Sequence, residues 1–180
     1  MSTKEELINK LRGLENKNAL QAVEELRVRG WLADGSLQGI ALCHAQLQSA
    51  DLMEANLCSV DFHQANLDFA DLSKAKLRAA KLTRASLQGV NLDHADLTNA
   101  DLYKANLRGA HNLTEEQLSK VNQLFGTTLP DGYPYEGRFN LAGDLALARW
   151  AKVDFNDPRT MASFYGVSLE TYLNGQAKKK

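Results

Sequence analysis

Leucine recurs at every fifth position through the middle of the chain. From Gly35 to Gly109 the sequence divides into fifteen quintets without an insertion, and each has a large apolar residue at its centre. A small residue lies two positions earlier, alanine in eleven quintets, and the position between them is aspartate or asparagine in nine. The central residues are Leu37, Leu42, Leu47, Leu52, Leu57, Phe62, Leu67, Leu72, Leu77, Leu82, Leu87, Leu92, Leu97, Leu102 and Leu107.

A period of five fits neither of the common regular elements. On an α-helix five residues turn the chain by about 500°, so successive leucines would drift around the whole surface. On a flat strand an odd step places successive leucines on opposite faces. The chain is therefore predicted to turn once per quintet, so that all fifteen central side chains point to a shared axis and form the core. Aspartate and asparagine suit such turns because their side chains bond nearby backbone groups.

This tandem A-(D/N)-L-x-x pattern resembles the pentapeptide-repeat family, over about residues 30 to 110. The resemblance implies a β solenoid, a right-handed quadrilateral parallel β-helix in which four quintets make one coil. Fifteen quintets then give about four coils, and residues twenty apart stack roughly 4.8 Å from one another. Because the two ends of such a column leave backbone groups unpaired, repeat arrays need caps.

Helical patterns flank the repeat on both sides and are expected to supply these caps. The predicted helices cover residues 3–12, 18–29, 114–126, 141–152, 158–165 and 168–174. Thr3, Asn18 and Thr114 are the expected N-caps of the first three, since glutamate or glutamine follows each of them three residues later. The stretches LTEEQL and TLPDG after the repeat also resemble the close of many bacterial, notably cyanobacterial, proteins of this family.

Three segments are therefore expected along the chain. They are an N-terminal helical cap at 1–30, the pentapeptide-repeat β-helix at 31–110, and a C-terminal helical region at 111–180 with a turn-rich loop and a disordered lysine tail, Lys178–Lys180.

Composition excludes several classes of protein. The net charge is −1, so no strong field of one sign attracts nucleic acid or lipid to the whole molecule. Two cysteines do not make a disulfide framework. No apolar run approaches the roughly 18 residues of a membrane span, and the charged N-terminus is unlike a signal peptide. We expect a cytoplasmic protein that does not contact a membrane.

A search for reactive residue types finds no phosphate-binding loop, nucleophile elbow or zinc-ligand spacing. In the register of twenty, no two of the four histidines are expected to share a column, and no cysteine is expected to stack on a histidine. Catalytic and metal sites need several such groups together. We therefore predict no catalytic residue, no metal, no cofactor, and a protein that is not an enzyme.

Basic residues gather in one part of the repeat. The set consists of five cations within eleven residues, with no acid between them, and a sixth one coil further on: Lys74, Lys76, Arg78, Lys81, Arg84 and Lys104. Two interpretations stay open. Asp61, Lys81 and Asp101 alternate in sign along one column, which favours solvated ion pairs worth about 0–1 kcal/mol each. The alternative is a recognition surface for an acidic partner.

The segment from Met161 to Tyr172 resembles the turn of a helix-turn-helix, with Gly166 between two short helices. A DNA reader needs a basic, exposed second helix. No lysine or arginine follows the turn before Lys178. A packed cap or a contact in a homodimer is therefore favoured, with DNA reading as the alternative.

Two classes of function follow. The favoured one is a non-catalytic scaffold for protein–protein interaction, whose partner the sequence does not identify. The alternative comes from family members that mimic duplex DNA and bind DNA gyrase, a topoisomerase. Mimicry needs a mostly negative surface, whereas residues 30–110 carry nine acids against seven bases. Binding of nucleic acid through the basic residues and the lysine tail is the least favoured.

Overall fold

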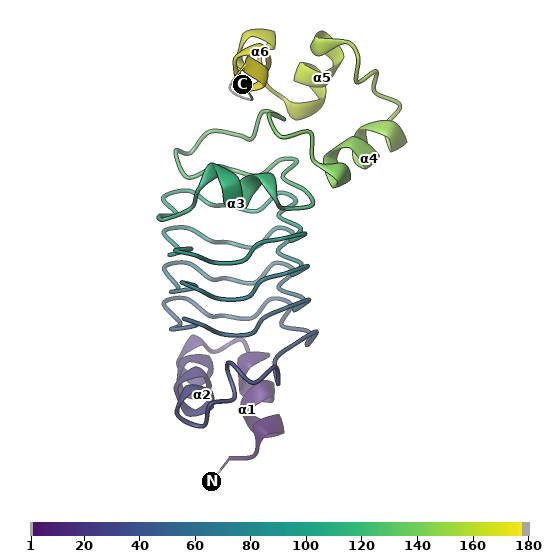
Figure 1. Cartoon of the computed structure of the whole chain (residues 1–180). Coiled ribbons are helices and arrows are strands. Elements are labelled where there is room, and N and C mark those ends of the chain that lie inside the picture. The colour runs from purple at the N-terminus through teal and green to yellow at the C-terminus, as the bar shows by residue number, and fades with distance from the viewer. Residues whose placement is uncertain (1, 178–180) are drawn as a thin grey trace.

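The computed structural model describes residues 2–177 as a stack of coils with helices at both ends (Figure 1). The predicted lysine tail lies outside these residues. The helices are α1 (Lys4–Leu11), α2 (Asn16–Val28), α3 (Glu115–Ser119), α4 (Ala142–Trp150), α5 (Pro158–Tyr165) and α6 (Leu169–Ala177). Within residues 2–177, no helix has the length and apolar character needed to cross a membrane.

Each quintet pairs with the quintet twenty residues later. Single-residue parallel bridges join the positions before the central residues, from Ala41 with Asp61 to Asn91 with His111. Four quintets therefore complete one coil, and the stack has four sides. We number the sides by their central residues: the first holds Leu37, Leu57, Leu77 and Leu97; the second Leu42, Phe62, Leu82 and Leu102; the third Leu47, Leu67, Leu87 and Leu107; the fourth Leu52, Leu72 and Leu92. All fifteen of these side chains are buried, none more than 2% exposed.

Each corner between two sides is a tight turn. The amide of the residue that opens a quintet donates to the preceding central carbonyl, as Ala65 does to Phe62 at 2.9 Å. The corner residue is the last residue of each quintet. At twelve non-glycine corners its φ lies between 53° and 61°, a left-handed conformation that costs about 1–2 kcal/mol. The aspartates and asparagines support these turns as the sequence predicts, since Asp61 accepts from the His63 amide at 3.0 Å. The corners are thus held by bonds within the quintet and between coils.

Helices α1 and α2 lie against the first coil. Arg12 Nε donates to the carbonyl of Ala41 at 3.2 Å, and Arg27 Nη2 donates to that of Asp51 at 2.6 Å. These side chains therefore satisfy carbonyl groups that have no coil beneath them. The buried side chains of the two helices join the apolar cluster of the coils: Leu7, Ile8, Leu11, Ala19, Ala22, Val23 and Leu26.

The start of α2 differs from the prediction. The helix begins at Asn16, and its N-cap is Glu15, which makes no capping bond through its side chain. Asn18, the predicted N-cap, lies inside the helix and donates to the Glu15 carboxylate at 2.6 Å. The Asn16 side chain instead donates to the carbonyl of Gln48 at 3.0 Å. The beginning of α2 is therefore set by contact with the coils. By contrast, Thr3 caps α1 with the predicted capping box.

The coil stack continues past the boundary predicted at residue 110. A parallel bridge joins Asp101 to Gln123, twenty-two residues apart instead of twenty. Helix α3 interrupts the quintets here and ends at Ser119, well before the predicted end at residue 126. The chain then returns to the wall of the coil, where its buried apolar residues are Val121, Leu124 and Leu129.

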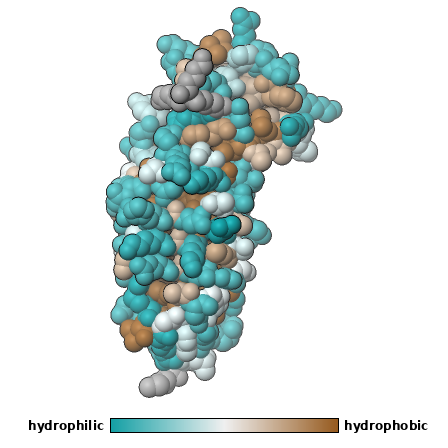
Figure 2. All heavy atoms as spheres, viewed as in Figure 1, coloured by the Kyte–Doolittle hydropathy of each residue, from teal (hydrophilic) through white to brown (hydrophobic). Residues whose placement is uncertain are grey.

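Residues 131–177 form a layer over the last coil. The Tyr135 side chain is fully buried, and its hydroxyl accepts from the Phe139 amide at 2.9 Å. Helices α5 and α6 follow one another at Gly166, which has a left-handed φ of 70°. Figure 2 shows hydrophilic residues over most of the coil stack and larger apolar patches near this end. Trp150, at the end of α4, is 82% exposed.

Candidate functional site

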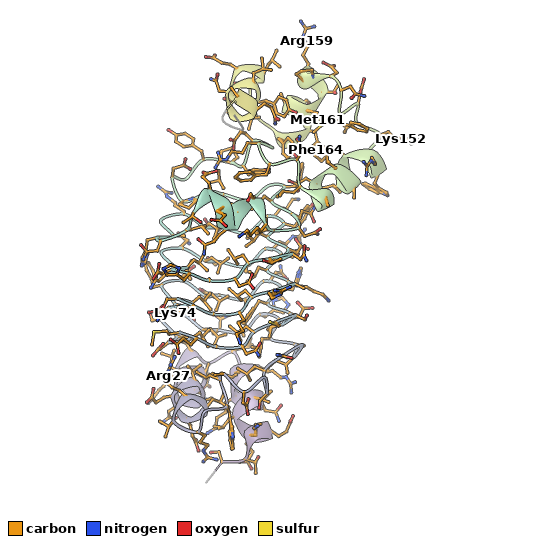
Figure 3. All side chains as sticks on the ribbon, viewed as in Figure 1. Arg27, Lys74, Lys152, Arg159, Met161 and Phe164 are labelled. Atoms are coloured by element: carbon orange, nitrogen blue, oxygen red, sulfur yellow. The ribbon has the colours of Figure 1, made fainter. Side chains whose placement is uncertain are left out.

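The predicted basic residues do not share one corner of the coil stack. Lys74 occupies the corner between the fourth and first sides and lies at an outer edge of the stack (Figure 3). Lys76 and Arg78 lie on the first side, and Lys81 lies on the second. Arg84 occupies the corner between the second and third sides. The five charges therefore follow half the perimeter of a single coil.

Three of the six predicted cations pair with acids on neighbouring coils. The distances are 3.4 Å for Lys74 with Glu54, 3.7 Å for Arg78 with Asp96 and 3.6 Å for Lys81 with Asp61. The basic side chains are more than half exposed, so each pair contributes about 0–1 kcal/mol. For these three cations the structure favours the interpretation as solvated ion pairs.

The other three cations, Lys76, Arg84 and Lys104, have no acidic partner within residues 2–177. Arg84 and Lys104 occupy the same corner on successive coils, and the Arg84 amide donates to the carbonyl of Tyr103 at 2.8 Å. We call this pair the Arg84–Lys104 column. The Lys104 ammonium also lies 5.2 Å from the centre of the Tyr103 ring, within range of a cation–π contact. The column therefore combines two exposed positive charges with an aromatic ring.

Aromatic side chains connect the second side of the coils to the C-terminal helices. Tyr103 stacks on Phe125 with ring centres 5.9 Å apart, and Phe125 lies 4.5 Å from Phe164 of α5. Tyr165 also contacts Phe125, at 5.9 Å. Phe164 lies between α5 and the coils in Figure 3. The helix-turn-helix-like segment is thus packed on the coil stack through its first helix.

One buried carboxylate fixes α4 to the last coil. Asp144 is 0% exposed, and its Oδ1 accepts from the amides of Leu124 and Phe125 at 3.1 and 2.9 Å. Burial raises the pKa of Asp144 to about 6, although the two amide bonds act in the opposite direction. Burial raises the pKa of the Tyr165 hydroxyl, and the nearby charge of Asp144 raises it further.

The expectation that no cysteine stacks on a histidine is wrong. Cys43 and His63 are twenty residues apart and share a column, and the His44 ring lies 6.2 Å from the His63 ring. Burial, and then the hydrogen bond and charge of Asp61, raise the pKa of the Cys43 thiol. A raised pKa leaves little reactive thiolate. Within residues 2–177, no group of three or more histidine, cysteine, aspartate or glutamate side chains is placed to hold a metal ion.

The repeat itself identifies the middle of the chain. A profile described as pentapeptide repeats matches residues 36–73 and 75–111, in eight copies. Over these residues, which are less than half of the chain, the sequence is similar to the pentapeptide-repeat family. The bridges twenty residues apart agree with the right-handed quadrilateral β-helix that the resemblance implies. No curated protein sequence matches the chain.

Several solved structures of pentapeptide-repeat proteins are similar to part of the chain. HetL, a protein involved in regulating heterocyst differentiation in the cyanobacterium Nostoc sp. strain PCC 7120, is 41% identical, with a TM-score of 0.48, over 52% of this chain and 42% of HetL. A protein from the Arabidopsis thaliana thylakoid lumen is 27% identical, with a TM-score of 0.43, over 52% of this chain and 60% of its own. QnrB1, a plasmid-mediated fluoroquinolone resistance protein, is 14% identical, with a TM-score of 0.27, over 50% of this chain and 58% of its own. The chain thus spans less than two thirds of each of these proteins.

The pentapeptide repeat accounts for the placement of Arg84 and Lys104, because stacking at twenty follows from the sequence. It does not account for Asp144 or Phe125, which lie in segments without a period. Asp144 is an acid in the first turn of α4, a common position for exposed acids, so the sequence carries no signal for its burial.

Proposed function

We propose that this pentapeptide-repeat protein is a non-catalytic scaffold that binds an acidic surface of another protein through the Arg84–Lys104 column. The observation that carries the proposal is a pair of exposed like charges, one coil apart, neither of which forms an ion pair within residues 2–177. Three neighbouring cations on the same coil do have acidic partners. The column therefore departs from the charge pairing of its surroundings.

The positive charges of Arg84 and Lys104 repel each other, and an acidic partner would relieve this repulsion. The two backbone positions are fixed about 4.8 Å apart by the β ladder, and both corner residues have left-handed φ values, 57° and 54°. The backbone cannot move these residues apart without breaking the ladder. Acidic groups of a partner would offset the repulsion, and such contacts mainly raise the association rate and the specificity. The half-buried Tyr103 ring lies beside Lys104 and borders the column.

The alternative, a gyrase-binding mimic of DNA, has less support. A mimic presents carboxylates at the density of phosphates, about one charge per 1.7 Å of duplex. On the second side of the coils, Lys81 lies between Asp61 and Asp101, and the Arg84–Lys104 column borders the same side. The surface is thus mixed in sign. Dimerisation through the C-terminal region and a cytoplasmic location stay predictions.

The test is capture of partners from the native host, with the full chain as bait and bound proteins quantified by mass spectrometry. The variant Arg84→Glu/Lys104→Glu reverses the column, and Lys10→Glu/Lys17→Glu makes the same charge change on α1 and α2. We expect an acidic protein that both the wild type and the second variant retain and the first variant loses. A captured set that is the same for all three baits would exclude the column as the binding surface.

A further inference from the structure

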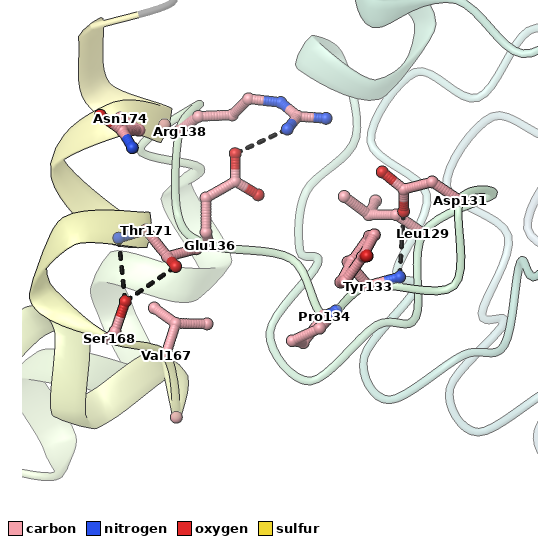
Figure 4. A pocket seen from close by; sticks show the side chains of 12 residues that line it. Leu129, Asp131, Tyr133, Pro134, Glu136, Arg138, Val167, Ser168, Thr171 and Asn174 are labelled. Carbon is pink, nitrogen blue, oxygen red and sulfur yellow. Dashed lines mark hydrogen bonds and ion pairs between the residues drawn. The ribbon is translucent and has the colours of Figure 1, made fainter.

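A second candidate site lies in the C-terminal layer that covers the last coil. A cavity of about 420 Å³ opens between the loop at residues 129–138 and helix α6, with the turn before α6 at its edge (Figure 4). Its volume is within the range of small-molecule sites, roughly 300–1,000 Å³. Apolar side chains line one part and polar side chains the other: Leu129, Pro134 and Val167, then Glu136, Thr171 and Asn174.

Glu136 is the charged group of this cavity. The residue is only 5% exposed, and its Oε1 accepts from Arg138 Nη1 at 2.6 Å. Its second oxygen, Oε2, has no hydrogen-bond partner within residues 2–177, and Figure 4 shows it turned away from the guanidinium group. The Oε2 atom keeps contact with solvent, so it can accept a hydrogen bond from a molecule that enters the cavity. The cavity therefore offers a carboxylate oxygen that no side chain or backbone group within residues 2–177 occupies.

Arg138 does not neutralise the site by itself. Its Nε and Nη2 atoms donate to the two oxygens of Glu115 at 3.0 and 2.9 Å. One guanidinium group is thus shared by two carboxylates, and a third acid, Asp131, lies at the rim of the cavity. Arg108 lies against Gly132, next to Asp131. The three acids outnumber the two guanidinium groups, which favours a cation over an anion.

Two close approaches hold Glu136 in place. A Cβ atom at Gly175 would lie 2.5 Å from Glu136 Cγ, so α6 meets this side chain directly. A Cβ atom at Gly137 would lie 2.2 Å from the Tyr165 ring. The direct contact with α6 restricts the Glu136 side chain on one side. The carboxylate is therefore positioned at the wall of the cavity.

We propose that this cavity binds a primary amine or guanidinium group carried on a short apolar stem. The cation would donate to Glu136 Oε2, as charge-assisted hydrogen bonds favour, and the stem would lie along Leu129, Pro134 and Val167. Either a free small amine or the side chain of a lysine or arginine on another polypeptide has this chemistry. The proposal concerns a different surface from the Arg84–Lys104 column and does not depend on it.

The test is a titration of the full chain followed by heteronuclear NMR. The probes are cadaverine, agmatine, and a hexapeptide with one central lysine, and 1-pentanol is the uncharged control. We expect saturable shifts in Gly137 and Thr171 with the cations and none with the alcohol. Binding of free amines alone points to a small molecule, and tighter binding of the peptide points to a protein side chain; both outcomes support the proposal.

Two variants separate the charge from the shape of the site. Glu136→Gln removes the charge and should weaken binding about tenfold or more, whereas Glu170→Gln on the exposed part of α6 should not. Glu136→Gln also removes the ion pair that holds Arg138. Val167→Phe therefore tests amine binding in a second way, because it fills the apolar part of the cavity and keeps the carboxylate. Arg84→Glu/Lys104→Glu should leave amine binding unchanged. Equal binding of 1-pentanol, or no saturable shift at about 10 mM amine, would overturn the proposal.

Discussion

Between residues 35 and 130 the buried side chains meet their equivalents about twenty residues away, whereas the helices after residue 141 are held by contacts that each occur once. The coil stack repeats one kind of central position, filled by leucine in every quintet except that of Phe62, and one kind of corner. The C-terminal layer depends on a cluster of aromatic rings around Phe125 and on one buried carboxylate, Asp144. Repetition gives the coils many similar contacts, so the loss of one such contact changes their stability little. The packing of the layer depends on individual residues.

The largest expected effect comes from placing a charge inside the leucine column. Leu77→Lys buries an unpaired ammonium group between coils, and we expect the protein not to fold. Lys76→Ala, one residue away and exposed, should change the melting temperature little, because Lys76 has no ion pair within residues 2–177. Circular dichroism melts compare the two. Similar melting temperatures would show that the inward and outward positions of this quintet are misassigned.

The next effect concerns the N-terminal end of the stack. Removal of residues 1–29 takes away the side chains that bond the open carbonyls of the first coil. An unpaired edge of β structure is a template for association, so we expect the shortened protein to form larger particles. Light scattering measures this directly. A monodisperse particle of unchanged stability would mean that α1 and α2 are not a cap.

A smaller, pH-dependent effect is expected in the C-terminal layer. The folded pKa of Asp144, about 6, lies above the roughly 3.9 of an unfolded aspartate, so the folded state binds the proton more tightly. Its contribution is full below about pH 4 and is lost as the pH rises through 6. Relative to Asp144→Asn, the wild type should therefore gain up to about 3 kcal/mol between pH 7 and pH 4.

Urea unfolding of both proteins at several pH values measures this difference. Other carboxylates, such as Asp71 and Asp96, have lowered pKa values and act in the opposite direction. They are present in both proteins, so their effects cancel in the comparison. A constant difference between the two proteins from pH 7 to pH 4 would contradict the assignment of Asp144.

The smallest expected effect is on DNA gyrase. The coils make a short column of mixed sign, and the Arg84–Lys104 column would repel a basic DNA-binding surface. We expect no inhibition of supercoiling, and no protection from quinolones, at about micromolar protein, a concentration that detects affinities near −8 kcal/mol. Salt-sensitive inhibition at that concentration would make the DNA mimic the first interpretation.

How far the sequence predicts the structure differs between the two regions. The period of five predicts which side chains point inward, which aspartates bond the turns, and that Arg84 stacks under Lys104. Each of these features follows from the register alone. The same arithmetic also places Cys43 under His63, contrary to the expectation that no cysteine stacks on a histidine. It fails at α3, because two extra residues break the register and conceal the return of the chain to the wall.

The candidate site in the C-terminal layer could not be predicted in this way. Helical periodicity and Gly166 give α5 and the turn that follows it, because these signals are local. Glu136 and Asp144 are ordinary acids in sequence, and their burial depends on which distant segments pack over them. Neither position belongs to a period, so nothing in the pattern separates them from acids that face solvent.

The corner that holds Phe69 limits how the repeat can lengthen during evolution. The Phe69 ring covers Gly89 one coil above, where a Cβ atom would lie 2.6 Å from the ring. Duplicating residues 50–69 would place a second phenylalanine over the first, and the two could not both keep this conformation. Duplicating residues 70–89 would instead add another glycine at the same corner. Twenty-residue coils with similar sequences are therefore not interchangeable. The Phe69 ring and the missing side chain of Gly89 set where an extra coil can be inserted.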